Sequence, residues 1–189
     1  MLPTKCRTFT ADPRPKLGSS ASASGYANSA KTEPVITGGC LCGCVRYELN
    51  GPPIDMGTCH CRHCQRWSGS AFHSAVAFAL TDLSFTKNEP LRYQSSSIME
   101  RSFCPSCGSP LAFRYLVSIE DPPTANPETV WISVGSLDQP EIRSPDWHFG
   151  VEGQLAWVNF DDGLPRTRCD ESAGLAKAYA SPEADQADN

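Results

Sequence analysis

The chain lacks any uninterrupted run of about 18 apolar residues, so no transmembrane helix is predicted. It also lacks an excess of positive charge, because 16 Lys and Arg stand against 21 Asp and Glu, which gives a net charge of −5. An acidic chain without a basic aromatic face is poorly suited to nucleic acid or to an anionic membrane, and neither partner is expected. The first residues lack the apolar stretch of a secretory signal, which favours a cytoplasmic protein.

Large apolar residues are scarce in residues 1–33, which are rich in Ser and Ala. Such a segment buries too little apolar surface to offset the entropy lost on ordering, so a disordered extension is predicted. Its basic residues outnumber the acidic ones, which leaves an organelle-targeting segment as the alternative. One domain is expected over residues 34–168, followed by a mostly disordered tail over residues 169–189.

Helical patterns are also scarce, and short alternating segments separated by turn residues dominate the domain. Strands are predicted near residues 35–37, 45–49, 72–80, 83–86, 91–95, 98–103, 111–116 and 130–134. Within the domain only residues 62–67 have a helical pattern, and a short helix over residues 172–180 would lack a clear apolar face. The sequence therefore predicts a mainly β fold of mostly antiparallel strands.

Cysteine, in contrast, is abundant, and seven of the ten cysteines fall into three clusters. These are Cys40 and Cys42; Cys59, Cys61 and Cys64; and Cys104 and Cys107. Cysteines two or three residues apart can close a small chelate ring on one metal, whereas disulfide partners need Cα atoms about 4.4–6.8 Å apart. Without a secretory signal, this spacing favours metal binding over disulfides, and zinc is the metal expected.

The segment CPSCG at residues 104–108 has the form of a zinc knuckle, in which a glycine follows the second cysteine. A knuckle supplies two of the four ligands that zinc requires, and Cys40 and Cys42 are natural donors of the other two. Cys44 can replace either of them, although a small buried cysteine at the start of a strand is its more ordinary explanation. Four thiolates would close the site and give it a structural role.

Cys59, Cys61 and Cys64 form a second, three-ligand set. If the fourth position is open, the site suits thiol chemistry, because three thiolates already offset the charge of Zn²⁺ and sulfur is its soft partner. If a fourth protein ligand closes it, the site is structural, and His60 and His63 are the neighbouring candidates. Strand alternation points His60 away from the two adjacent cysteines, so both histidines are expected to support the site rather than to bind metal.

Five segments resemble, in order and spacing, the glutathione-dependent formaldehyde-activating enzymes and the related centromere protein V group. They are GGCLCG at 38–43, CHCRHC at 59–64, SGSAF at 68–72, FCPSCGS at 103–109 and SVGSLD at 133–138. The resemblance spans roughly residues 34–166 and implies a β-tent of twisted antiparallel sheets with little helix. It also implies two zinc sites, one structural and one near the substrate. The matching positions imply a structural site of Cys40, Cys42, Cys104 and Cys107, and a second, catalytic site of Cys59, Cys61 and Cys64.

The reaction implied by the resemblance is the condensation of formaldehyde with glutathione to S-(hydroxymethyl)glutathione, a carbon–sulfur lyase reaction run in reverse. The expectation is therefore a zinc-dependent, lyase-type enzyme whose partners are glutathione or a similar thiol and a small electrophile. Two alternatives stay open. One is a glutathione-dependent enzyme that acts on a larger metabolite, and the other is a non-catalytic zinc module that binds a protein.

Glutathione carries two carboxylates, so basic residues are expected beside the second site. Arg62 and Arg66 are the nearest in sequence, with Arg101 and Arg114 as further candidates. Trp67 is a candidate for lining the pocket, although core packing beside the zinc is its more ordinary role. His73 and His148 are candidates for moving protons, although a packing role is the more ordinary one for a single histidine on a strand.

Overall fold

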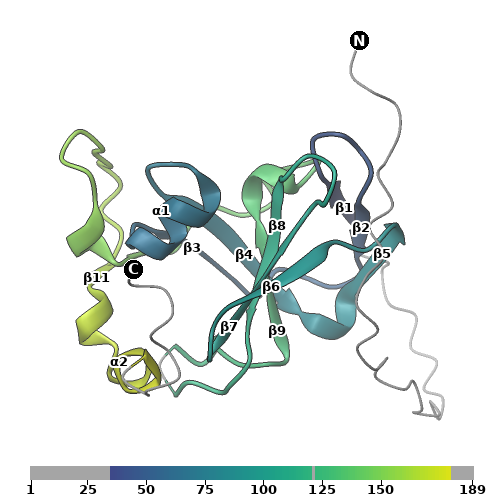
Figure 1. Cartoon of the computed structure of the whole chain (residues 1–189). Coiled ribbons are helices and arrows are strands. Elements are labelled where there is room, and N and C mark those ends of the chain that lie inside the picture. The colour runs from purple at the N-terminus through teal and green to yellow at the C-terminus, as the bar shows by residue number, and fades with distance from the viewer. Residues whose placement is uncertain (1–34, 121, 180–189) are drawn as a thin grey trace, which may run out of the picture.

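The structure is a computed structural model that describes residues 35–120 and 122–179, so the predicted disordered extension lies outside the described residues. Within the described residues, eleven strands form two sheets, accompanied by two short α-helices and four 3-10 turns. This confirms the mainly β, twisted-sheet fold (Figure 1). Within these same residues, no helix combines the length and the apolar character needed to cross a bilayer.

The smaller sheet has three antiparallel strands in the order β1-β2-β5. They are β1 (Ile36–Gly39), β2 (Arg46–Leu49) and β5 (Leu83–Lys87). Gly38 of β1 lies opposite Tyr47 of β2, and a Cβ at position 38 would fall only 2.2 Å from the Tyr47 hydroxyl oxygen. Glycine at position 38 therefore lets the fully buried Tyr47 reach Ser136, 2.8 Å away.

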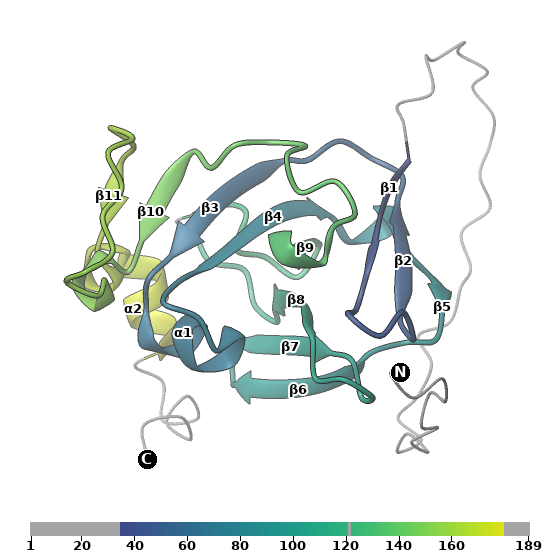
Figure 2. The same cartoon turned by 90° about the horizontal axis from the view of Figure 1, so that it is seen from above.

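The larger sheet has eight strands in the order β11-β10-β3-β4-β9-β8-β7-β6. Their bounds are β3 (Asp55–Cys59), β4 (His73–Ala79), β6 (Leu91–Ser96), β7 (Met99–Phe103), β8 (Pro110–Tyr115), β9 (Thr129–Ser133), β10 (Trp147–Phe149) and β11 (Arg166–Thr167). This sheet bends so strongly that β3 and β4 lie across from β6 and β7, with the small sheet standing at one end (Figure 2). The two sheets share one tent-shaped core.

The helical elements are short and connect the strands. They are α1 (Arg62–Ser68), α2 (Ala173–Tyr179) and the 3-10 turns η1 (Leu80–Asp82), η2 (Val134–Ser136), η3 (Val151–Gly153) and η4 (Cys169–Glu171). Helix α1 is the helix predicted near residues 62–67, and it lies at the end of β3 (Figure 2). Because α1 directly follows β3, Cys61 and Cys64 lie just beyond the C-terminal end of that strand.

One edge of the large sheet departs from the antiparallel pattern. Strand β10 runs parallel to both β3 and β11, with Phe149 in register with Cys59 on one side and with Thr167 on the other. Parallel strands end at the same edge of a sheet. The segments that follow β3, β10 and β11 therefore leave the sheet side by side. These segments surround the second cysteine cluster.

The largest apolar cluster fills the space between the two sheets and includes Val45, Tyr47, Phe78 and Leu111. A second cluster joins Ile98 and Ile119 to Leu175 of α2, which is 4% exposed. The short helix considered over residues 172–180 forms as α2, and disorder in the rest of the tail stays a prediction. A single apolar residue anchors the helix, and that left no amphipathic pattern to recognise in the sequence.

Candidate metal centres and substrate pocket

The first cluster brings together Cys40, Cys42, Cys104 and Cys107, whose sulfur atoms all lie within 4.8 Å of one another. The sulfurs of Cys40 and Cys42 are 3.5 Å apart, and those of Cys42 and Cys104 are 3.8 Å apart. Four zinc–sulfur bonds of about 2.3 Å in a tetrahedron place the sulfurs about 3.8 Å apart. The four predicted ligands therefore fit a tetrahedral zinc ion, with Cys44 outside the group.

Two similar turns build this cluster. In each, a glycine with positive φ follows the second cysteine: Gly43 at 69° and Gly108 at 74°. The amides of Gly43 and Gly108 donate to the carbonyls of Cys40 and Cys104, which closes each turn. The αL conformation costs a residue with a side chain free energy but costs glycine almost none, so glycine at these two positions lets both pairs of sulfurs converge.

Hydrogen bonds prepare these sulfurs unequally for ionisation. Burial raises the pKa of the Cys104 thiol to about 12, whereas hydrogen bonds from Ser109 outweigh burial and bring the pKa of Cys107 to about 6. The amide of Val45 donates to the Cys40 sulfur over 3.2 Å and, against the effect of burial, lowers the pKa of that thiol. All four thiols ionise together at neutral pH only if a cation offsets their charge, as Zn²⁺ would.

The second cluster brings together Cys59, Cys61 and Cys64, whose three sulfur atoms also lie within 4.8 Å of one another. Cys59 ends β3, Cys61 caps the N-terminus of α1, and Cys64 lies in the first turn of that helix. The Cys61 sulfur accepts the amide hydrogen of Cys64 over 3.5 Å. The strand end and the helix start thus supply three ligands from one short segment, as the spacing predicts.

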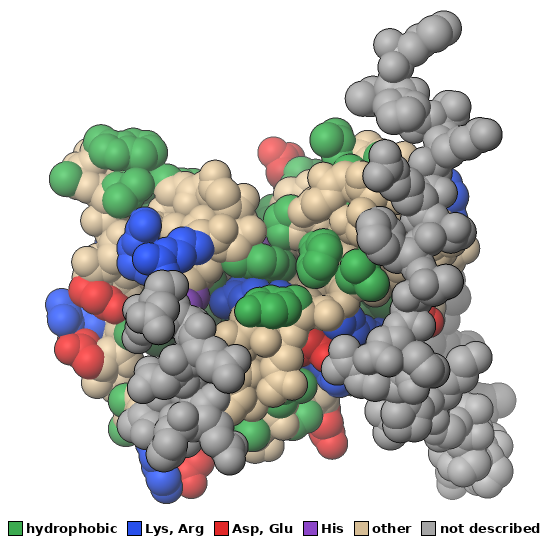
Figure 3. All heavy atoms as spheres, in the orientation of Figure 1, with side chains coloured by type: hydrophobic (Ala, Val, Ile, Leu, Met, Phe, Trp, Pro, Cys, Tyr) green, Lys and Arg blue, Asp and Glu red, His purple; other side chains and the backbone are tan. Residues whose placement is uncertain are grey.

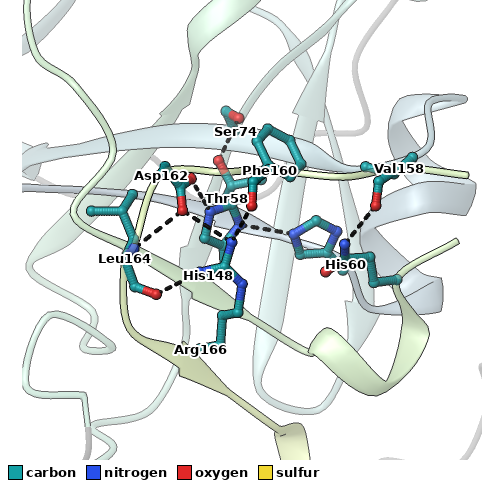
Figure 4. Close-up of polar contacts among 10 residues, drawn as sticks. Thr58, His60, Ser74, His148, Val158, Phe160, Asp162, Leu164 and Arg166 are labelled. Carbon is teal, nitrogen blue, oxygen red and sulfur yellow. Dashed lines mark hydrogen bonds and ion pairs between the residues drawn. The ribbon is translucent and has the colours of Figure 1, made fainter. Parts of the chain in front are cut away.

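Polar side chains on the opposite side of this segment hold it in place (Figure 4). His60 is fully buried, its Nε2 lies 2.9 Å from Nδ1 of His148, and Nε2 of His148 lies 2.7 Å from Asp162. The buried amide of Gln65 donates to the carbonyls of His60 and Gly153. Alternation along the strand therefore turns His60 away from the metal ligands, as expected, and into a support for them.

The direction of these hydrogen bonds follows from the carboxylate at one end of the chain. Asp162 can only accept, so His148 donates from Nε2 and, when neutral, accepts at Nδ1. His60 must then donate from Nε2, which leaves its Nδ1 as an acceptor. Burial lowers the pKa of His60, and the bond from His148 lowers the pKa of Asp162, so a neutral His60 at one end of the chain and an ionised Asp162 at the other are favoured.

The thiols of the second cluster differ in how readily they ionise. Hydrogen bonds from the thiols of Cys169, Cys59 and Cys64 lower the pKa of Cys61, which also lies at the start of a helix. The hydrogen bonds with Cys61 and Cys64 and its burial raise the pKa of Cys59 well above its ordinary value. Ionisation is therefore favoured at Cys61 over Cys59 and Cys64, and a cation is needed to hold all three as thiolates.

Cys169 is a neighbour of this cluster that sequence reasoning missed. It lies beside Cys61 across Gly150, where an added Cβ would be 2.9 Å from Cβ of Cys61 and 3.2 Å from the sulfur of Cys169, although 108 residues separate the two cysteines in sequence. No short spacing links Cys169 to the other cysteines, so only the parallel arrangement of β3, β10 and β11 brings it there.

A pocket of about 570 Å³ opens beside the first cluster, whose Cys40 lines it, and none of the three cysteines of the second cluster is in its lining. Its lining includes Cys40, Leu41, Ser70, His73, Ser133 and Asp138. Figure 3 shows the surface hollowed at this place, between the part that covers α1 and the part that covers β1 and β2. His73 at its inner end lies in register with Cys59 on the neighbouring strand, so the pocket adjoins the second cluster.

Arg101 has the most unusual environment of the four candidate arginines. It is 4% exposed, its guanidinium lies 4.8 Å from the centre of the Trp67 ring, and its Nη1 has no hydrogen-bond partner among the described residues. After burial, its charge lowers the pKa of His73, and it opposes the larger effects of Cys61 and burial that raise the pKa of Cys64 to about 12. Arg101 thus places a buried positive charge where thiolates gather.

The other candidates lie elsewhere. Arg62 is exposed and bonds to Gln65 within α1, Arg66 is exposed at the end of that helix, and Arg114 pairs with Glu100 over 3.0 Å. Neither Arg62 nor Arg66 nor Trp67 lines the pocket. The ring of Trp67 packs edge-on against His73 at 4.8 Å. A direct substrate contact for these three residues stays a prediction.

Comparison with known families now bears on this geometry. A family model described as glutathione-dependent formaldehyde-activating enzyme matches residues 35–152, more than half of the chain. The chain belongs to this glutathione-dependent formaldehyde-activating enzyme family. Both cysteine clusters and the pocket lie inside the match, whereas Asp162, Cys169 and α2 lie beyond it.

Two individual proteins resemble this family member. It is 37% identical over 84 residues to an uncharacterized lyase of Schizosaccharomyces pombe, a match that covers 43% of this chain and 59% of the relative. The chain thus spans less than two thirds of that relative. A crystal structure of a Rhodobacter sphaeroides protein aligns with 69% of this chain and 98% of its own, at 22% identity and a TM-score of 0.40.

Proposed function

We propose that this family member is a zinc-dependent carbon–sulfur lyase-type enzyme that joins the thiol of glutathione to an aldehyde, formaldehyde being the simplest. The observation that carries the proposal is the convergence of three cysteine sulfurs, from Cys59, Cys61 and Cys64, within 4.8 Å beside a pocket. Three protein ligands are the number that catalytic zinc sites use, with the fourth position left to water or substrate.

The donor set favours a sulfur substrate over water. Three thiolates bring a bound Zn²⁺ to a net charge of about −1, which weakens it as an acid toward water and leaves it a good partner for soft ligands. Zinc bound there would supply the means to hold a thiol in its thiolate form near neutral pH. Arg101 supports the same charge distribution, because its buried guanidinium favours negative charge at Cys64.

The condensation itself needs little from the protein beyond placement and a proton. The glutathione sulfur forms a bond to the carbonyl carbon, the π pair of the carbonyl moves to oxygen, and that oxygen takes up a proton. His73 Nε2 and the Ser133 hydroxyl, which lie 3.0 Å apart in the pocket lining, can position such a proton. Burial, with a smaller effect from Arg101, lowers the pKa of His73 to about 4, so this imidazole is neutral at physiological pH.

The size of the pocket supports glutathione and leaves room for an electrophile larger than formaldehyde. A volume of about 570 Å³ lies within the range of about 300–1,000 Å³ that small-molecule sites occupy. Arg46 and Asp138, which form an ion pair in the lining, offer polar partners for the ends of a tripeptide. A series of aldehydes of increasing size would therefore decide between formaldehyde and a larger metabolite.

The test is a product assay with glutathione and that aldehyde series, on the zinc-loaded protein. Cys61→Ala should abolish formation of the hydroxyalkyl thioether, whereas Gln94→Ala, an exposed position on β6, should leave it unchanged. Equal rates above the uncatalysed background for Cys61→Ala and the unsubstituted protein would refute the catalytic role of the cluster.

A second candidate function is a non-catalytic zinc module. The observation in its favour is the Cys169 thiol beside Cys61, because a fourth thiolate would close the site. This candidate predicts two tightly bound zinc ions, no product with any aldehyde, and no response of the second zinc to glutathione.

A further inference from the structure

The end of β11 delivers a cysteine to the second cluster. Cys59 and Thr167 are both in register with Phe149 in the three parallel strands. Cys61 and Cys169 each follow by two residues, so both leave the sheet at the same edge. Both cysteines border Gly150 there. The contact therefore follows from the strand register and does not depend on a chance approach of loops.

Hydrogen bonds within the η4 turn and to Glu152 hold the backbone that carries Cys169. Glu171 accepts the amide hydrogen of Arg168 over 2.9 Å, which caps the η4 turn. Glu152, from the turn after β10, accepts the amide hydrogen of Cys169 at 3.3 Å and 3.4 Å. The backbone beneath Cys169 is thereby held against the segment that borders the cluster.

Gly150 leaves the space that the contact needs. A Cβ at this position would lie 2.9 Å from Cβ of Cys61 and 3.2 Å from the sulfur of Cys169. The φ of Gly150 is also +66°, a conformation that favours glycine. Any side chain at position 150 would stand between the two cysteines.

We infer that Cys169 is a displaceable fourth ligand of the second metal site, supplied by the segment beyond the family match. Cys59, Cys61 and Cys64 give three sulfur ligands, and Cys169 is a fourth sulfur beside Cys61 across Gly150. Its sulfur lies outside the group whose members are all within 4.8 Å of one another, so binding requires the Cys169 side chain to shift toward the cluster. A ligand that must be drawn in is readily exchanged for a substrate thiol.

This inference rests on the proposed function, because it needs a metal at the second cluster, and it specifies how that site is controlled. In the resting protein Cys169 keeps the metal four-coordinate and excludes water. Glutathione would take its place by thiol-for-thiol exchange: one metal–sulfur bond breaks as another forms, and the proton of the incoming thiol passes to the released Cys169. No oxidant or reductant takes part, and the cluster keeps the same charge.

The first arm of the test needs no substitution. The zinc-loaded full chain is treated briefly with iodoacetamide, with and without saturating glutathione, and each cysteine is followed by peptide mass spectrometry. Cys169 should be protected without glutathione and alkylated at least about tenfold faster with it, while Cys104 and Cys107 stay protected in both. Ophthalmic acid, which replaces the thiol of glutathione with a methyl group, should leave Cys169 protected.

The second arm compares Cys169→Ser with Asp170→Ser, a control in the same turn whose side chain is exposed. Loss of an outer-shell partner already lowers metal affinity by about 10–100-fold, so loss of a direct ligand should weaken one of the two zinc ions at least about tenfold. X-ray absorption should show about four sulfurs per zinc in the unsubstituted chain and in Asp170→Ser, and an average of about 3.5 in Cys169→Ser.

The possible outcomes separate the two proposals. Two bound zinc ions with Cys169 alkylated at the same rate with and without glutathione would overturn the inference and leave the proposed function standing. Protection of Cys169 that glutathione does not relieve would make it a permanent ligand and overturn both its exchange and the thiol-binding mechanism. A chain that binds zinc only at the first cluster would overturn both proposals.

Discussion

The two cysteine clusters use the same ligand chemistry in opposite surroundings. The first lies between the small sheet and the β7–β8 turn, and its Cys40 and Cys104 belong to the largest apolar cluster of the described residues. The second lies at the end of β3 against a buried polar network and beside a pocket. Packing of Cys40 and Cys104 in the apolar core anchors the first cluster, although Cys40 also lines the pocket, whereas a buried polar network supports the second.

Charge separates the clusters as well. Arg101 is the single Lys or Arg among the buried residues of the described chain, and its effect reaches Cys64 of the second cluster. The sulfurs of the first cluster accept hydrogen bonds from neutral groups instead, such as the amides of Val45 and Ser106. A buried cation favours additional negative charge nearby, for example when a substrate thiolate binds. Neutral amides, in contrast, suit a site whose charge stays constant.

The largest effect should come from opening the first cluster. Cys104→Ser removes a fully buried ligand that links β7 and β8 to the small sheet, and structural zinc supplies folding free energy on the order of 10 kcal/mol. The variant should be insoluble or unfolded by circular dichroism, whereas Ser106→Ala, in the exposed middle of the same turn, should fold normally. A soluble Cys104→Ser protein with two bound zinc ions would contradict the structural role of the first cluster.

Opening the second cluster should remove function and one zinc but keep the fold. Cys61→Ala should bind one zinc ion per chain by elemental analysis and give no product with glutathione and aldehydes. Its melting temperature should fall far less than that of a first-cluster variant, because the apolar core between the sheets keeps all four cysteines of the first cluster. Unfolding of Cys61→Ala comparable to that of Cys104→Ser would show that both sites are structural.

Acid should destabilise the side of the molecule next to the second cluster through His73. Its pKa is about 4 in the folded protein, lowered first by burial and then by Arg101, against about 6.5 in an unfolded chain. Between these values the unfolded state binds more protons, so the free energy of unfolding falls as the pH drops from about 6.5 to 4, by on the order of 3 kcal/mol. Urea unfolding of His73→Gln across this range should show a shallower pH dependence, and identical slopes would contradict the assignment.

The smallest effect should come from removing the buried charge. Arg101→Gln should weaken zinc at the second cluster by about tenfold, the lower end of the effect of outer-shell changes, and leave the first zinc unchanged. Competition with a chromophoric chelator measures both affinities, and Arg92→Gln, at an exposed position on the neighbouring β6, is the matched control. Equal losses at the two clusters would show that Arg101 acts on overall stability alone.

Sequence periodicity and spacing predicted most of the fold and most of the ligands. Eight strands and helix α1 form where alternation or a helical pattern indicates them, and all seven predicted cysteine ligands fall into two groups that can hold a metal. Three strands were missed. Strand β3 is buried at three consecutive positions and shows no alternation, and β10 and β11, with three and two residues, are too short to show a period. Their parallel pairing depends on contacts between segments far apart in sequence.

The same long-range pairing explains what was missed at the site. Asp162 and Cys169 have no local motif, and they reach His148 and Cys61 only because the chain returns along β11. The burial of Arg101 could not be predicted from the sequence either. Alternation along β7 does not decide which face of the sheet a single charged residue occupies.

The central claim is that the second cluster holds a metal whose coordination a substrate thiol can change. Its most direct test is the visible spectrum of the protein with cobalt in the second cluster, titrated with glutathione and compared with Cys61→Ala. We predict a saturable change of the cobalt bands in the unsubstituted protein and none in Cys61→Ala. A cobalt spectrum of the unsubstituted protein that stays constant at saturating glutathione would contradict the account.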